Sequence, residues 1–572
     1  MRFAKKILEL AASLSCACLR LSIYDKFRAL KKMQKFMSIV SEAVKASAAE
    51  KRRRGRTTAT KGGMLVVAGI VFGWVLWPMM LNFAIHRQVA LRPGSKVRKI
   101  WQKFPFPLDF KIYLWNVTNP DEVTKGEKPV LNQIGPYFFE EWQEKVDIVD
   151  RKEDDTVEYS LKNKWIFVPG KSDGLDGQEE LVMPHIFMLA LIMAGVRERP
   201  KAMPIINKAV NSVFRNPTSL FVRVKAMDMM FNGLPIDCNV TDFAGSAVCS
   251  LLREKAEGTL QIDGPDQYRF SLLGAKNDTP SLARTRVLRG VKKLKQIGTV
   301  VEHDGKSNIS KWDDEFCDTF NGTDGTVFHP KLYEDEDVVA FSPDLCRSIS
   351  SKYRSKSKAK GISTNHYEAS LGDPSTIPEQ RCYCEAEDKC LTAGMMDLYK
   401  CVGVPLIATL PHFYLTDKQY LTMVDGLKPN PDQHKIFIDF EPFTGSPISA
   451  RKRVQLNMMI FPIDKVKIIK TFPRALLPLV WIEEGIVLPN WMIRQLKLSH
   501  FAIGFMGFVK WMMILTGLVM CGFAAYLMTA ADGANKATVK SANIENEKMS
   551  HSPNGKSNGI KTISAQLPVS VD

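Results

Sequence analysis

The 572-residue sequence lacks several motifs that mark common enzyme sites. It contains no H-E-x-x-H zinc motif, no Walker phosphate-binding loop and no G-x-G-x-x-G dinucleotide fingerprint. The sequence therefore predicts a protein that is not an enzyme, and we expect no cofactor.

Most of the chain has little net charge, because the positive charge is concentrated near the N-terminus. Residues 1–63 carry 16 Lys or Arg against four acidic residues, with K-R-R-R-G-R at 51–56, whereas the rest adds little to the net charge of +17. No nucleic-acid-binding module accompanies this basic arm, and such an arm suits the anionic cytoplasmic leaflet of a membrane. We expect a membrane partner and no nucleic acid.

Two long runs lack charged residues. Residues 64–85 contain none, and a helix of that length spans roughly 33 Å, enough for a hydrocarbon core of about 30 Å. Residues 511–531 are likewise uncharged. The sequence predicts transmembrane helices at 64–85 and 510–531, which leaves residues 86–509 as one large loop.

All N-glycosylation sequons lie in this loop. They are Asn116, Asn239, Asn277, Asn308 and Asn321. Their confinement to one side of both spans indicates that the loop is extracellular. The arm 1–63 and the tail 532–572 are then cytoplasmic, and the tail, rich in Ser, Asn, Lys and Gly, is predicted to be disordered.

Cysteine usage agrees with export. Of 11 cysteines, eight lie in the loop, and an even number in an exported segment indicates disulfides. The cluster at 382–390 could instead suggest a metal site, but its C-x-C spacing is not the paired C-x₂₋₄-C of zinc sites. Cys238 and Cys249, 11 residues apart, could form a local bridge.

The first residues leave an alternative open. M-R-F-A-K-K-I-L-E-L-A-A-S-L-S-C-A-C-L resembles a weak signal peptide. Cleavage there would place the loop in the cytosol, away from glycosylation and oxidation, so a cytoplasmic arm, amphipathic or disordered, is the favoured interpretation.

Strand and helix signals alternate within the loop. Residues 454–460 alternate apolar Val454, Leu456, Met458 and Ile460 with more polar neighbours, the period of a strand. Residues 184–216 instead predict two helices, the first apolar nearly all round. Lys201, Lys208 and Arg215 near them are candidate ligand-binding residues, and a merely solvated face is the alternative. The fold class is α+β.

Several segments together resemble the class B scavenger receptor family, and within it the insect sensory neuron membrane proteins. The segments are P-L-D-F-K-I-Y-L-W-N-V-T-N-P-D-E-V, I-G-P-Y-F-F-E-E-W-Q-E-K-V-D-I, N-G-T-D-G-T-V-F-H-P, S-P-D-L-C-R-S-I, the C-x-C cluster with V-G-V-P-L-I-A-T-L-P-H-F-Y-L, and F-E-P-F-T-G-S-P-I-S-A-R-K-R-V-Q-L-N-M. They cover about residues 62 to 530 in the family's order. The long arm departs from the family pattern, and we expect Met33 or Met37 as alternative starts.

The resemblance implies a fold and a set of disulfides. The fold is an irregular antiparallel β-barrel with an internal tunnel and a helical cap, which would fall at 184–216. The implied pairs are Cys317–Cys382, Cys346–Cys401 and Cys384–Cys390, with Cys238 and Cys249 outside the six-cysteine framework.

The resemblance also implies a function. It is the capture of lipophilic pheromones and their passage through the tunnel to an odorant receptor complex, in the plasma membrane of olfactory neuron dendrites. A scavenger receptor for lipids or lipoproteins is one alternative, and a two-span ion-channel subunit or a structural adhesion protein are others.

Overall fold

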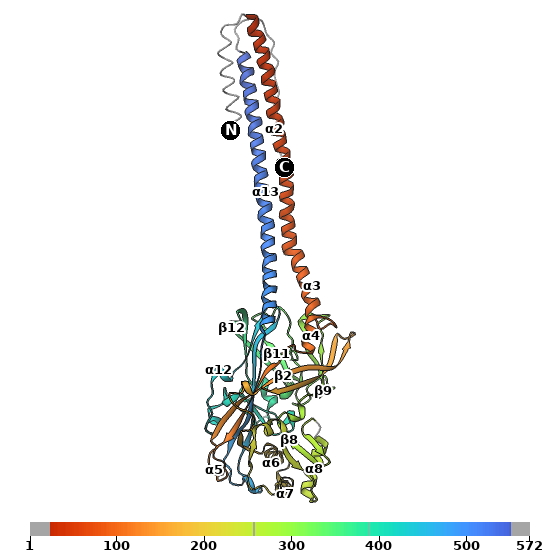
Figure 1. Ribbon diagram of the computed structural model, residues 1–572, viewed down its shortest axis with the longest axis vertical. Helices are drawn as coiled ribbons and strands as arrows, with labels where there is room; N and C mark the ends of the chain where they lie inside the picture. The colour runs from red at the N-terminus through yellow and green to blue at the C-terminus, as the bar shows by residue number, and fades with distance from the viewer. Residues whose placement is uncertain (1–22, 256–257, 387, 551–572) are drawn as a thin grey trace. The chain divides into compact units, whose positions relative to one another are not determined.

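The computed structural model describes residues 23–255, 258–386 and 388–550, and these form two units. One is a helical unit formed by segments that end at Leu81 and begin again at Ser499. The other is the body, Asn82–Leu498. Each is described by itself (Figure 1).

Long helices make up the helical unit. They are α2 (Ile23–Val71), a π-helical turn η2 (Phe72–Leu76), α3 (Trp77–Val89) and α13 (Asn490–Ser550). Residues 28–89 and 490–540 are long and apolar enough to cross a membrane. Pro78 lies two residues after the end of η2, in the first turn of α3. Proline cannot donate a backbone hydrogen bond to the preceding turn, so the helix is irregular there.

Glycines let the helices of this unit approach closely. A Cβ atom built on Gly62 would lie 2.8 Å from the carbonyl oxygen of Gly517, and one built on Gly517 would lie 2.7 Å from that of Gly62. Gly69 faces Ile514 and Gly73 faces Lys510 in the same way. Small residues at the contact are the usual route to close helix packing in membranes.

Both ends of the helical unit are helical. Residues 23–63, for which we expect an amphipathic or a disordered arm, belong to α2, and residues 532–550 belong to α13 although we expect disorder in the tail. Ala and Lys, frequent in both segments, are strong helix formers. The signal-peptide-like residues 1–22 and the end of the tail, 551–572, lie outside the described residues.

One antiparallel sheet organises the body. Its order is β10-β9-β3-β2-β1-β18-β17-β16-β13-β12-β11, with β15 also paired to β17, and β14 to β15. The strands are β1 (Leu108–Val117), β2 (Leu131–Arg151), β3 (Thr156–Phe167), β9 (Thr279–Leu288), β10 (Val300–His303), β11 (Val338–Ser342), β12 (Arg347–Ala359), β13 (Ile362–Ala369), β14 (Met395–Asp397), β15 (Ile407–Thr409), β16 (Ile436–Glu441), β17 (Ser446–Ile460) and β18 (Ala475–Val487).

A short segment, residues 322–324, joins the two outer edges of this sheet, and we call it the seam. Thr323 bridges Thr299, next to β10, on one side and Ala340 of β11 on the other. The Val300 amide donates to the Gly322 carbonyl (3.1 Å), and the Phe341 amide donates to the Thr323 carbonyl (2.8 Å). The seam therefore closes the sheet into a barrel.

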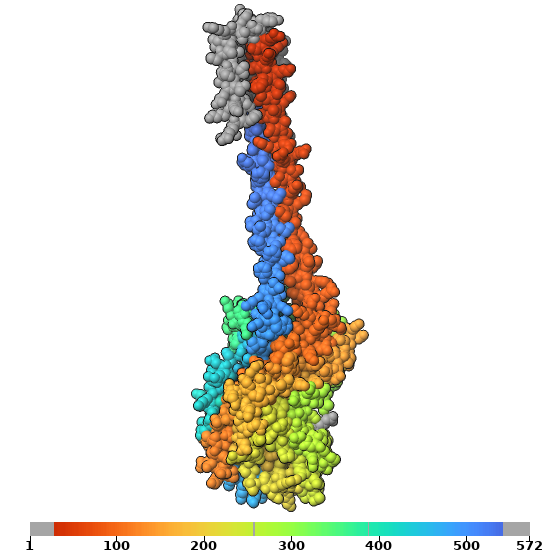
Figure 2. All heavy atoms as spheres, viewed as in Figure 1, coloured from red at the N-terminus to blue at the C-terminus, as the bar shows by residue number. Residues whose placement is uncertain are grey.

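Helices gather at the end of the body opposite α4 (Figure 1). The helices α6, α7 and α8 form a cap, and the yellow to yellow-green spheres of this part of the chain cover the same end in the space-filling view (Figure 2). The elements of this region are β4 (Glu180–Pro184), α6 (Ile186–Glu198), η4 (Pro200–Ala202), α7 (Met203–Val213), β5 (Phe221–Lys225), η5 (Asp228–Asn232), β6 (Leu234–Asp237), α8 (Phe243–Lys255), β7 (Gln261–Gly264) and β8 (Gln267–Phe270).

Short helical turns occupy the connections of the body. They are α4 (Lys96–Gln102), α5 (Pro120–Thr124), η3 (Pro169–Lys171), η6 (Gly274–Lys276), η7 (Leu294–Gln296), α9 (Glu315–Asp318), η8 (Pro343–Leu345), η9 (Pro378–Tyr383), α10 (Tyr399–Val402), η10 (Pro411–Phe413), α11 (Lys418–Leu421), α12 (Pro431–His434) and η11 (Lys467–Ile469).

The cap agrees with the predicted helices in place and differs in extent. Helices α6 and α7 fall within 184–216, and the apolar α6 buries Ile186, Leu189 and Ile192. Ile205 lies four residues before the buried Ala209 on α7, yet it is exposed, because it belongs to the first turn of the helix. Helix α8 has only a weak apolar period and was not predicted, yet it packs on α7 through Val248 and the buried Cys249.

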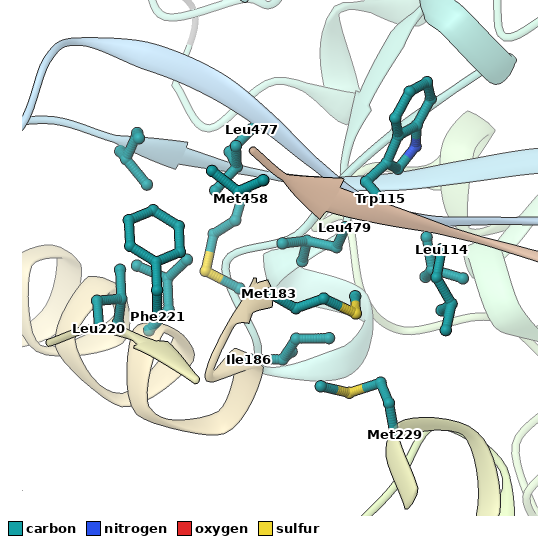
Figure 3. Close-up of a cluster of buried hydrophobic side chains, with 14 of the residues drawn as sticks. Leu114, Trp115, Met183, Ile186, Leu220, Phe221, Met229, Met458, Leu477 and Leu479 are labelled. Carbon is teal, nitrogen blue, oxygen red and sulfur yellow. The ribbon is translucent and has the colours of Figure 1, made fainter. Parts of the chain in front are cut away.

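The main apolar core lies where the cap meets the barrel. Figure 3 shows Met183 and Ile186 from the cap side against Leu114 of β1, Met458 of β17 and Leu479 of β18. All five are buried.

Candidate functional site

The two faces of β17 are buried to different extents. Lys452, Val454 and Leu456 share one face, and the alternate residues Arg453, Gln455 and Asn457 share the other. The residues of the second set are buried, at 7%, 0% and 0% exposed. Those of the first set keep accessible surface.

The more accessible face of β17 points into the barrel. Val454 and Leu456 pack against the second apolar cluster, which holds Val157 of β3, Val287 of β9 and Phe341 of β11. These strands lie far from β17 in the sheet order, so the contacts cross the interior. These inward side chains keep accessible surface although they pack against residues across the interior.

Leu456 connects the two large apolar clusters of the body. It packs against the cluster below the cap, which holds Met458, and also against the second cluster. Apolar side chains therefore continue from the cap into the barrel interior.

Charged side chains stand on the inward face next to this apolar row. Lys452 of β17 lies opposite Glu484 of β18, with 3.6 Å between Nζ and a carboxylate oxygen. Its Nζ also lies 3.8 Å from Asp344 of η8, several strands away along the sheet. We call Glu141, Gln143, Asp344, Lys452 and Glu484 the charged cluster.

Asp344 places this cluster inside the barrel. Its side chain is 76% accessible, yet its charge acts on Glu141 of β2, Lys452 of β17 and His303 of β10. Because these strands belong to different sides of the barrel, a side chain near all three lies in its interior.

Burial determines the protonation of Glu141. The Glu141 carboxyl is 2% exposed, and burial together with the negative charge of Glu484 holds its pKa well above the usual range of a glutamate. Burial opposes the charge of Lys452, but Glu484 and Asp344 raise its pKa overall. The cluster thus combines a buried carboxyl group with a raised pKa, the amino group of Lys452 and two further acidic side chains.

A second buried charge holds the seam. Asp324 accepts hydrogen bonds from Trp101 Nε1 and from the Tyr159 hydroxyl, both at 2.9 Å. Lys145 lies 3.9 Å away and donates to the Thr326 hydroxyl at 3.0 Å. Burial lowers the pKa of Lys145 to about 8.

The outward face of β17 is covered by polar contacts of the chain itself. Arg453 Nε donates to Glu483 at 2.7 Å, and Gln455 Oε1 accepts the His412 amide at 2.9 Å. The His412 ring stacks on His434 with 4.3 Å between ring centroids. His412, which carries no catalytic motif, is therefore part of a packed polar layer.

The three basic candidates on the cap are not brought together as one site. Lys201 and Lys208 are exposed, in η4 and α7. Arg215 pairs with Asp237 and stays 79% exposed. Their role in ligand binding remains a prediction.

Disulfides brace the body. The structure pairs Cys317 with Cys382, Cys346 with Cys401 and Cys384 with Cys390, which are the pairs that the resemblance implies. Cys238 also pairs with Cys249 and ties β6 to α8. Asp314 lies near Cys317 and Cys382, but a disulfide leaves those sulfurs without thiolate ligands for a metal.

All five sequon asparagines lie in the body. Asn239, Asn308 and Asn321 are exposed. Asn116 and Asn277 are half-buried, and their side-chain oxygens accept the amides of Val182 (2.7 Å) and Trp165 (2.9 Å). Asn321 directly precedes the seam. Glycosylation at these positions is a prediction.

Sequence comparison matches this architecture to a family. The pattern of the CD36 family matches residues 61–528. The chain belongs to the CD36 family. This is the family that the class B scavenger receptor resemblance indicates, so the recognition is confirmed.

Relatives within the CD36 family have sensory names. Sensory neuron membrane protein 1 of Apis mellifera is 47% identical over 512 residues, covering 89% of this chain and 98% of that protein. The proteins of the same name from Manduca sexta (42% identical, 78% and 85% covered) and Antheraea polyphemus (41% identical, 81% and 88% covered) are also similar. As in this family, the chain has two terminal apolar helices around an antiparallel barrel, and it is a two-span membrane protein.

The charged cluster was not predicted from the sequence. Glu141 and Gln143 lie in E-E-W-Q-E, where charged or polar residues occupy both faces of a strand, and Asp344 lies in S-P-D-L-C. Nothing in this local pattern distinguishes Glu141 from Glu140 or Glu144, because its inward direction depends on strand pairing that sequence spacing does not reveal.

Proposed function

We propose that this protein is a non-enzymatic receptor that captures long-chain lipophilic molecules of the pheromone type at the cap and conducts them through the barrel interior. The supporting observation is the continuity at Leu456, where apolar side chains from the cap meet those inside the barrel. From there the ligand is handed to an odorant receptor complex in the sensory neuron membrane.

An apolar path removes a solvation barrier. Each CH₂ group left in water costs about 0.8 kcal/mol, so a ten-carbon stretch faces roughly 8 kcal/mol on its way through bulk water. A conduit lowers this cost without covalent chemistry. The sensory names of the relatives support the same function.

The sequons and the disulfides of the body support a topology for the chain in the membrane. The body, with its sequons and disulfides, is extracellular and both termini are cytoplasmic, in the plasma membrane of sensory dendrites. The exposed Lys201, Lys208 and Arg215 are candidates for contacting the polar end of a ligand at the cap.

Photo-crosslinking tests the conduit. The full-length protein in lipid nanodiscs is labelled with a photoreactive long-chain acetate, and labelled peptides are mapped. We expect label in residues 184–216 and next to Leu456. Leu456→Trp fills the path, so label inside the barrel falls while label on the cap persists.

A matched substitution controls for the added indole. Leu282 is 66% exposed, so Leu282→Trp should leave the pattern of label unchanged. Label spread over the exterior, or an intrinsic ion current from the protein expressed alone, would contradict the proposal.

A further inference from the structure

One carboxylate oxygen inside the barrel has no partner. Oε2 of Glu141 is buried and makes no hydrogen bond among the described residues, whereas Oε1 accepts Gln143 Nε2 at 3.2 Å. A buried polar atom left unpaired costs on the order of 1–3 kcal/mol, so native proteins rarely retain one without a use.

The neighbouring groups converge on the same space. Gln143 Nε2 also donates to Glu484 at 3.4 Å, so Gln143 links Glu141 to Glu484. Lys452 Nζ lies 3.6 Å from Glu484 and 3.8 Å from Asp344. Both separations exceed a charge-assisted hydrogen bond of about 2.8 Å, so a ligand oxygen can still approach the ammonium group.

Apolar residues continue directly from this point. Val454 and Leu456 follow Lys452 on the same face of β17, at successive spacings of roughly 7 Å along a strand. A chain lying along Val454 and Leu456 would bring its end to Lys452.

We propose that the charged cluster binds the neutral carbonyl head of a long-chain ester or aldehyde, which accepts from the Lys452 ammonium and from the Glu141 carboxyl group. This inference rests on the conduit proposed above and specifies the class of ligand that it holds. The hydrocarbon chain of the ligand lies along the apolar row.

Charge gives the site its selectivity. Burial raises the pKa of Glu141 and so favours the protonated carboxyl group, which is a hydrogen-bond donor. Glu484 and Asp344 carry negative charge beside Lys452 and repel a ligand carboxylate. A neutral ester therefore binds more tightly than the fatty acid of the same chain length.

Binding to the full-length protein in nanodiscs tests the site. The probes are a long-chain alkenyl acetate, the fatty acid of equal length and the hydrocarbon of equal length. An ester is chosen because it forms no Schiff base with lysine. We expect the wild type to bind the acetate at least about tenfold more tightly than the fatty acid.

Three substitutions separate the contributions of Lys452 and Glu141 to acetate binding. Lys452→Met and Glu141→Leu should each weaken acetate binding by about tenfold and leave hydrocarbon binding unchanged. Glu141→Gln keeps a neutral donor and should retain acetate binding. Lys125 is exposed and outside the cluster, so Lys125→Met serves as the control. Melting temperatures identify variants that fail to fold. If Lys452→Met does not fold, the folded Glu141→Leu variant still tests the site.

The outcomes distinguish this site from the conduit. The head-group site would be overturned if folded Lys452→Met and Glu141→Leu bound the acetate as tightly as the wild type does. It would also be overturned if the fatty acid bound as tightly as the acetate. In either case, binding of the hydrocarbon would still support the conduit. Failure of every probe, the hydrocarbon included, to bind the wild type would overturn the conduit and the site together.

Discussion

Single buried charges decide how the barrel is closed. Asp324, 3% exposed, joins the seam to Trp101 and Tyr159 and neutralises Lys145. The Lys145 ammonium also lies 4.6 Å from the centre of the Trp101 ring. Each group is stable in the interior only because the others are present.

Asp324→Ala should destabilise the body strongly. The substitution leaves the Lys145 ammonium buried without its counter-charge, which costs about 3–5 kcal/mol. We expect a lower melting temperature and less protein at the cell surface, and partial rescue by adding Lys145→Met. Asp335 is exposed, so Asp335→Ala should change neither quantity. Wild-type stability in Asp324→Ala would contradict this role.

Buried histidines should make stability depend on pH. Burial lowers the pKa of His434 to about 4, and burial with the nearby His434 lowers that of His412 to about 3. The folded state then binds fewer protons than the unfolded state below about pH 6.5, so stability falls as pH falls, by about 1.4 kcal/mol per histidine at one unit below.

His434→Gln should reduce this loss. The melting temperature of the variant should drop less than that of the wild type between about pH 7.5 and about pH 5.5. His366 has the opposite sign: its hydrogen bond to Asp439 raises its pKa, so its contribution is fully present at low pH and is lost as pH rises. His366→Gln should therefore increase the loss on acidification. Equal pH dependence in all three proteins would refute the assignment.

The sequence predicts the direction of a side chain where the pattern of a single strand is enough. Alternation within β17 is enough for Leu456, which faces the interior. The importance of Glu141 and Asp344 could not be predicted in this way, because it arises from interactions across the barrel between residues more than about 100 positions apart. Ile205 shows the limit of helical periodicity in the first turn of α7, where an apolar side chain is exposed.

At the scale of elements, the helical unit depends on which glycine faces the neighbouring helix. Gly62 lies against Gly517, whereas a Cβ on the adjacent Gly63 would meet no atom within 4 Å. Gly69 and Gly73 form a G-x-x-x-G motif that is recognisable in the sequence, whereas Gly62 belongs to no such motif. Its contact depends on the pairing register of two distant helices, which is not encoded locally.

Gly62→Leu and Gly63→Leu form a matched pair. Cys521 Sγ lies 3.8 Å from the carbonyl oxygen of Ala59, so an Ala59→Cys substitution should form a disulfide with Cys521 under mild oxidation. Gly62→Leu should abolish most of this cross-link by separating the helices, and Gly63→Leu should preserve it. Equal cross-linking in both would show that the close approach is not required.

At the scale of the whole molecule, the two-span organisation was predictable because charge-free runs are a local signal. The barrel and its cap came from resemblance, since no stretch of the loop specifies how its strands close. Helix α8 and the seam were missed for that reason: their local sequence is turn-rich or weakly periodic, and only their partners define them.

Glycan mapping tests the topology of the entire chain. Asn239→Gln, Asn308→Gln and Asn321→Gln should each increase electrophoretic mobility by one glycan, because these side chains are exposed and the body is expected outside the cell. Asn430→Gln, outside any sequon, should not. Absence of all shifts in a protein insensitive to glycosidase would place the body in the cytosol.

The position of β18 in the barrel has a consequence for biosynthesis. It is the last strand among the described residues and pairs with both β1 and β17, so these two strands remain open sheet edges until β18 is in place. A ribosome reaches these residues just before it translates α13. Chains interrupted upstream would expose two open sheet edges to quality control, and only a nearly full-length product can close the barrel.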